Sequence, residues 1–70
     1  MAFQVVEWDA NGDVTDRKVW RHPFDTREEA VTRVEWVISR YLRSGYDEKQ
    51  ESWWAHAANG DRMRFIIEGV

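Results

Sequence analysis

The feature that most constrains the fold is a four-residue segment, Ala-Asn-Gly-Asp, which occurs at residues 10–13 and again at residues 58–61. Asn-Gly tolerates the positive φ angles that both central residues of a type I′ turn require, so each segment predicts a two-residue hairpin loop. Stretches rich in β-branched and aromatic residues flank both turns. We therefore expect two β-hairpins, Phe3–Ala10 with Asp13–Arg21 and Glu51–Ala57 with Arg62–Glu68.

The stretch between the two hairpins has the pattern of one helix, from about Arg27 to Arg43. Thr26 stands three residues before Glu29, which is the spacing of a capping box. Gly45 suits the left-handed position just past a helix end, and Ser44–Gln50 is predicted to be a polar loop. At 100° per residue, the apolar residues fall within an arc of about 140° and form a face that packs on a sheet. These residues are Ala30, Val31, Val34, Val37, Ile38, Tyr41 and Leu42.

Together the elements predict an α+β fold of the order β-hairpin, helix, β-hairpin (ββαββ), with a four-stranded antiparallel sheet and one helix on one face. Residues 1–70 are expected to form a single domain, because domains start at about 50 residues. No apolar run approaches the roughly 18 residues of a membrane span, and no basic segment of a signal peptide precedes the first strand. We therefore expect a cytoplasmic protein with no membrane partner.

The predicted turn at Asn59-Gly60 assigns residues to the two sheet faces. A two-residue loop there places Trp54 opposite Phe65 on the helix side, and Trp53 opposite Ile66 on the outer side. The other residues expected on the helix side are Phe3, Val5, Trp20, Ser52, His56, Met63 and Ile67. The outer face then carries an apolar patch with an arginine rim. Its members are Val6, Trp8, Arg17, Val19, Trp53, Arg62, Arg64 and Ile66.

Aromatic residues are unusually abundant, with five Trp among the 70 residues. So small a core cannot hide all of them, and large exposed apolar patches usually mark interfaces. A second candidate surface is on the helix, where Trp36 lies well away from the apolar arc and is flanked by Arg33 and Arg40. At both surfaces two interpretations stay open: arginines cap the rings by stacking, or the rings anchor a partner.

The sequence contains no pattern typical of a catalytic or metal-binding site. There is no cysteine, the two histidines, His22 and His56, lie in different predicted hairpins, and no glycine-rich phosphate loop is present. The sequence therefore predicts a protein that is not an enzyme and that binds no metal ion or cofactor.

The function predicted from the sequence is a non-enzymatic interaction protein whose partner is another protein or a second copy in a homodimer. Its predicted interaction residues are Trp8, Arg17, Arg33, Trp36, Arg40, Trp53, Arg62, Arg64 and Ile66. The alternative is a single-stranded nucleic-acid-binding module that stacks bases on the aromatic and arginine side chains of the outer sheet face. The net charge of −3 disfavours it, as do carboxylates in the same strands and turns: Glu7, Asp9, Asp13, Asp16, Glu51 and Glu68.

Overall fold

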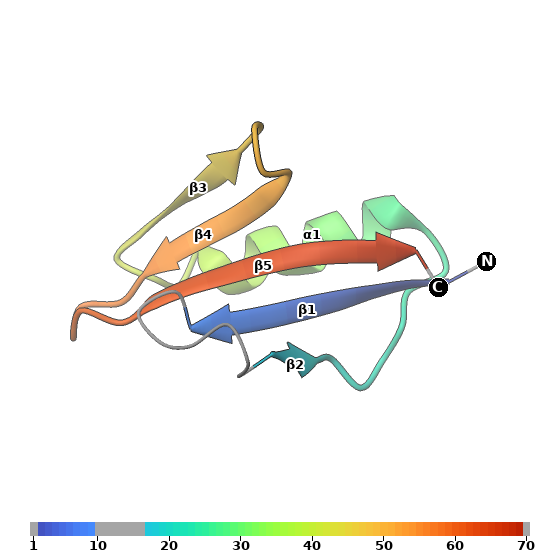
Figure 1. The fold of residues 1–70 in the computed structure, drawn as a ribbon, viewed down its shortest axis with the longest axis horizontal. Helices are drawn as coiled ribbons and strands as arrows, with labels where there is room; N and C mark the ends of the chain where they lie inside the picture. The colour runs from blue at the N-terminus through green and yellow to red at the C-terminus, as the bar shows by residue number, and fades with distance from the viewer. Residues whose placement is uncertain (1, 10–16, 70) are drawn as a thin grey trace.

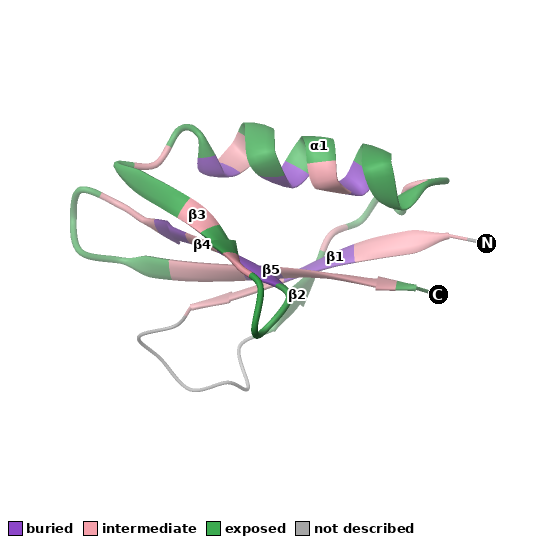
Figure 2. Ribbon diagram, turned by 90° about the horizontal axis from the view of Figure 1, so that it is seen from above, coloured by how far each residue is buried: buried purple, intermediate pink, exposed green. Residues whose placement is uncertain are grey.

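The computed structural model describes residues 2–9 and 17–69. Within them the chain forms β1 (Phe3–Asp9), β2 (Lys18–Val19), α1 (Arg27–Ile38), β3 (Arg43–Asp47), β4 (Ser52–His56) and β5 (Arg62–Gly69). The strands make one antiparallel sheet in the order β2-β1-β5-β4-β3, and α1 lies along one of its faces (Figures 1 and 2). The predicted α+β class and antiparallel sheet are confirmed. The described residues contain five strands, however, and not the predicted four.

The start of α1 is as predicted, but its end is not. The side chain of Thr26 accepts a hydrogen bond from the backbone N–H of Glu29 at 3.2 Å, as a helix N-cap does. The helix ends at Ile38, five residues before the predicted end at Arg43. There the hydrogen bonds tighten to three-residue spacing, from the Tyr41 N–H to the Ile38 carbonyl at 3.0 Å. Leu42, expected on the buried face, is consequently 72% exposed.

The predicted loop Ser44–Gln50 is wrong for most of its length, because Arg43–Asp47 forms the edge strand β3. This strand lacks the alternation of apolar and polar residues that would have identified it, and backbone pairing with β4 holds it in place. The Asp47 carboxylate then accepts hydrogen bonds from the N–H groups of Lys49 and Gln50 at 3.0 and 3.4 Å. These bonds close a turn that leads directly into β4.

The loop between β4 and β5 is one residue longer than predicted. Ala57 and Asp61 close it through a 2.8 Å hydrogen bond from the Ala57 N–H, and Gly60 takes a positive φ of 94°. The loop therefore comprises residues 58–60. Phe65 pairs with Trp53, whereas the two-residue loop predicted that it would pair with Trp54. A one-residue change of register exchanges the two faces of a strand.

The exchange of faces corrects several predictions at once. Trp53, expected on the outer face, is 6% exposed beneath the helix, beside the fully buried Ala55 and Phe65. Its indole packs against the Tyr46 ring at a centroid distance of 4.7 Å, with the Arg27 guanidinium 5.9 Å from the ring centre. Three residues expected on the helix side alternate with these core residues along β4 and so face outward: Ser52, Trp54 and His56.

In the first hairpin the register differs from the predicted one by two residues, so the predicted faces hold. The Trp20 N–H donates a hydrogen bond to the Val5 carbonyl at 2.9 Å. The predicted register instead paired Trp20 with Phe3. Val5 is fully buried, and Phe3 and Trp20 pack against the core. Val6 lies on the outer face as predicted, yet is only 2% exposed there. The predicted turn at Asn11-Gly12 lies outside the described residues.

The core lies between α1 and the middle of the sheet. Ala30, Val34 and Ile38, the buried stripe of α1, face the sheet (Figure 2). Seven residue pairs join β1 to β5, from Phe3 with Gly69 to Asp9 with Met63. Strands from the two ends of the chain therefore form the centre of the sheet (Figure 1).

Candidate functional surfaces

The nine predicted interaction residues fall into three groups. Five face outward from the sheet opposite α1: Trp8, Arg17, Arg62, Arg64 and Ile66. Three belong to α1 or follow it directly: Arg33, Trp36 and Arg40. Trp53 belongs to the core, so it is withdrawn from the candidate residues. The remaining eight lie on two surfaces on opposite sides of the molecule.

We call the outer face of the sheet the sheet surface, and define it by Trp8, Arg17, Arg43, Trp54, His56, Arg62 and Arg64. The register aligns Trp54, Arg64 and Trp8 in one row across β4, β5 and β1. The Arg17 guanidinium then lies 5.8 Å from the centre of the Trp8 ring. Indole rings and guanidinium groups thus alternate along this row, and neighbouring strands are about 4.8 Å apart.

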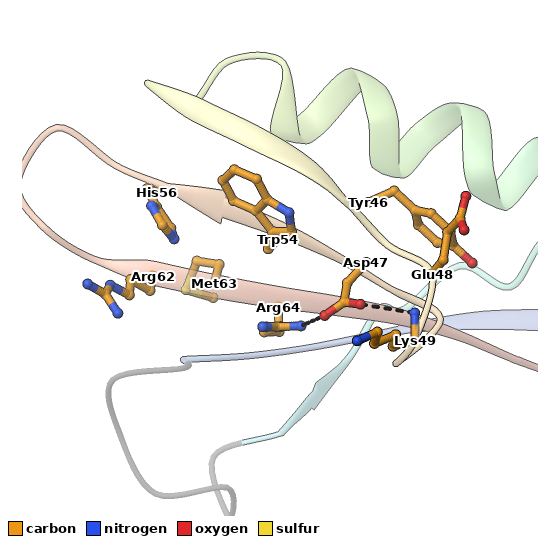
Figure 3. Close-up of a pocket in the computed structure, with 9 residues that line it drawn as sticks. All are labelled: Tyr46, Asp47, Glu48, Lys49, Trp54, His56, Arg62, Met63 and Arg64. Carbon is orange, nitrogen blue, oxygen red and sulfur yellow. Dashed lines mark hydrogen bonds and ion pairs between the residues drawn. The ribbon is translucent and has the colours of Figure 1, made fainter.

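Arg64 is fixed in the middle of this row. Its Nη1 donates to Ser52 and Gln50 at 2.9 Å each. It also lies 3.5 Å from the Asp47 carboxylate, the contact drawn in Figure 3. Ser52 is only 2% exposed under it. These contacts join β5 to β3, to β4 and to the turn between them, so Arg64 holds this end of the sheet together.

Trp54 leans across the edge strand at Gly45. A Cβ atom placed on Gly45 would come within 2.7 Å of the Trp54 indole, so only glycine leaves room for the ring in this position. On its other side the indole lies 4.9 Å from the His56 ring. The backbone of β3 and the His56 ring therefore hold Trp54, half-buried, against the outer face.

A second row lies one step further along the same face. Arg43, His56 and Arg62 are directly opposite one another on β3, β4 and β5. Arg43 and Arg62 are exposed, and neither forms an ion pair with any described residue. A groove of about 700 Å³ adjoins this row and the Trp54 ring (Figure 3). Its lining is Tyr46, Asp47, Glu48, Lys49, Trp54, His56, Arg62, Met63 and Arg64.

Two carboxylates that adjoin the sheet surface are neutralised by its arginines. Asp47 is paired with Arg64, and Glu68 with Arg17 at 3.1 Å. Glu7, counted against nucleic-acid binding in the sequence, belongs to the helix side, where it accepts a 3.2 Å hydrogen bond from the Trp20 indole N–H. Asp13 and Asp16 lie outside the described residues. The described part of this face therefore carries an excess of positive charge, in contrast to the whole chain.

We call the outward face of α1 the helix surface, and define it by Glu29, Thr32, Arg33, Trp36 and Arg40. Trp36 is 53% exposed, as its position away from the apolar arc predicted. The guanidinium groups of Arg33 and Arg40 lie 5.6 and 4.8 Å from its ring centre. A groove of about 780 Å³ runs beside the ring. Its lining is Phe24, Thr26, Glu28, Glu29, Thr32, Arg33 and Trp36.

Sequence reasoning missed three residues of the sheet surface: Arg43, Trp54 and His56. Arg43 had been assigned to the helix, and the other two to the core. Gly45 is a signal for Trp54 alone, because a glycine inside a strand often marks a close approach of another group, here the Trp54 ring.

The comparisons with known proteins do not identify a family. No protein-family model matches the chain, and no significant similarity to a curated protein or to a solved structure was found. Within the described residues, no three His, Asp or Glu side chains gather closely enough to hold a metal ion. Nor does the described part of the chain include a helix with the length and hydropathy needed to cross a membrane.

Proposed function

We propose that this chain is a non-enzymatic, cytoplasmic interaction protein that pairs with a second copy of itself through the helix surface. The observation that carries the proposal is Trp36, a large apolar side chain that is 53% exposed on a helix. Tryptophan flanked by arginine is the composition most enriched among residues that dominate binding energy. A partner that covers the ring would remove its apolar surface from water.

The charge pattern of α1 supports a second copy as the partner. Asp25, Glu28 and Glu29 place negative charge at the beginning of the helix, whereas Arg33 lies at its middle and Arg40 beyond its end. Arg27 lies over the Trp53 ring of the core, and Glu35 is not part of the helix surface. Two such helices packed antiparallel bring the acidic part of each against the basic part of the other. A two-fold axis requires this kind of self-complementary surface.

The spacing of outward residues along α1 determines which residues of the two copies lie opposite one another. Glu29, Thr32, Arg33 and Trp36 share an outward arc of about 100°, opposite the buried stripe. With the two-fold axis at the middle of α1, Trp36 of one copy lies opposite Glu29 of the other. Arg40 then lies opposite Asp25. The groove beside Trp36, which Phe24 and Thr32 help to line, gives the ring of the second copy an apolar wall.

Light scattering over micromolar to millimolar concentrations tests the pairing. We expect a mass of twice the 8.4 kDa monomer, and a monomer for Trp36→Glu with an unchanged circular dichroism spectrum. Leu42→Glu is the matched control, because Leu42 is 72% exposed but lies off the helix surface. A wild-type chain that stays monomeric over the whole range would overturn the proposal.

A charge exchange tests the antiparallel geometry itself. Arg40→Asp and Asp25→Arg each place like charges opposite one another and should weaken the dimer. The double variant restores opposite charges and should recover the dimer in large part. A double variant that dimerises no better than the single variants would show that the copies pair through another surface.

A further inference from the structure

The row Arg43, His56 and Arg62 on the sheet surface is not used by the proposed pairing, and its charges are uncompensated. Two arginines flank His56 on the neighbouring strands, two strand spacings (about 10 Å) from each other, and neither arginine has an ion-pair partner among the described residues. An anion bound over the row would be attracted by both guanidinium groups and would accept hydrogen bonds from them and from the imidazole N–H.

Trp54 stands next to this row and offers a flat apolar surface. Its indole leans over Gly45 on one side and contacts the His56 ring at 4.9 Å on another. A ring held in this way loses little conformational entropy when a ligand stacks on it. Trp54, His56 and Arg62 line one groove of about 700 Å³, within the usual size of ligand sites, and Arg43 lies opposite His56 on the neighbouring strand.

From this juxtaposition we propose that the sheet surface binds single-stranded nucleic acid, with a phosphate over Arg43, His56 and Arg62 and a base stacked on Trp54. A strand fits better than a free nucleotide because the adjoining row continues with Arg64, Trp8 and Arg17 across the sheet. Trp8 supplies a second ring about 10 Å from Trp54, two strand spacings away. Alternating rings and cations along a groove are the usual means of binding single strands without sequence preference.

The whole-chain charge of −3 does not oppose this assignment, because the charges are unevenly distributed. Among the described residues, the strand carboxylates that face outward, Asp47 and Glu68, are each paired with an arginine. Glu48, which also lines the groove, has Lys49 beside it in the turn. Phosphate binding depends on local cations, and two guanidinium groups at this row are uncommitted.

The test is fluorescence anisotropy with a labelled oligothymidylate at low and moderate salt. We expect micromolar affinity that falls about sevenfold between about 50 and 200 mM salt, the value for two neutralised phosphates on a single strand. Trp54→Ala should weaken binding about tenfold, and Trp54→Phe should retain most of it. Arg43→Gln and Arg62→Gln, at exposed positions that leave the fold intact, should each reduce the salt dependence.

Arg33→Gln is the matched control, because it removes an arginine from the helix surface and should leave the affinity unchanged. No binding at low salt would overturn the inference, as would equal affinity in Trp54→Ala. Polyglutamate tests for a protein partner, and thymidine monophosphate for a free nucleotide; either one competing as well as the oligomer would also overturn it. The result is independent of the proposed pairing, because Trp36→Glu disrupts the dimer without altering the sheet surface.

Discussion

The two candidate surfaces differ in how they are built. The helix surface comes from one element, so the helical repeat alone brings Glu29, Arg33 and Trp36 together. The sheet surface comes from several strands, and its members share a face only because the strands pair in one register. A shift of one residue in the pairing of β4 with β5 would leave the helix surface intact but exchange the outward and buried residues of β4. Surfaces made by local geometry are therefore the more robust to sequence change.

Truncation of the adjacent residues Trp53 and Trp54 tests which of the two faces the core. Trp53→Ala opens a cavity beneath α1 and should destabilise the fold by about 3–5 kcal/mol, enough to unfold a domain of this size. Trp54→Ala removes a half-buried ring and should cost about 1–2 kcal/mol. Urea denaturation measures both changes. Equal losses would contradict the register described here.

Gly45 offers a more selective change on the sheet surface. Gly45→Ala places a methyl group within 2.7 Å of the Trp54 ring, so it should destabilise the fold by about 1–3 kcal/mol through overpacking. Adding Trp54→Ala should recover part of the loss, because the clash then disappears. Gly69→Ala is the control, since its added Cβ meets nothing closer than Phe3 at 4.0 Å. Thermal unfolding of the four variants measures the coupling.

The loop between β4 and β5 gives a direct test of how register is set. Deleting Ala58 leaves Asn59-Gly60 as a two-residue loop closed by Ala57 and Asp61, which suits a type I′ turn. Trp53 should stay buried, and stability should change by about 1 kcal/mol or less. Fluorescence quenching by iodide reports the exposure of the tryptophans. Increased quenching together with a large loss of stability would show that the register had moved.

Trp36→Glu should have the smallest effect on stability, less than about 0.5 kcal/mol. The substitution loses cation–π contacts with Arg33 and Arg40. It gains a carboxylate three residues from Arg33 on α1 and four residues from Arg40, which follows the end of the helix, so both guanidinium groups are within its reach. The measurement is chemical denaturation at a concentration where the wild-type chain is monomeric. A loss above about 1 kcal/mol would mean that the ring has a structural role in the monomer.

The features predicted correctly from the sequence depend on residues close together in the chain. The features predicted wrongly depend on pairing between distant residues. Thr26 as helix cap, the buried stripe of α1 and the exposure of Trp36 depend on residues a few positions apart, and all were predicted. The position of Trp53 depends on whether Gly60 is the second residue of a two-residue loop or the third of a longer one. The sequence Ala-Asn-Gly-Asp is compatible with both.

The edge strand β3 could not be predicted for a related reason. Ser44, Gly45 and Asp47 have low intrinsic preference for strands, and the strand exists because β4 offers an unpaired edge to it. Arg43 joins the sheet surface only as a consequence of that pairing. The arginine-rich character of the outer face was predicted, but the row that carries its uncompensated charge was not.

The central pairing of β1 with β5 has a consequence for the time course of folding. Phe3 pairs with Gly69, so the middle of the sheet closes only when residues from opposite ends of the sequence meet. Contacts of such long sequence separation slow folding, because the entropy of closing the intervening loop is lost before the core forms. We expect β3, β4 and β5 to assemble first as a meander. During synthesis, β1 and α1 would then wait on the ribosome until β5 emerges, with the apolar stripe of α1 exposed to chaperones.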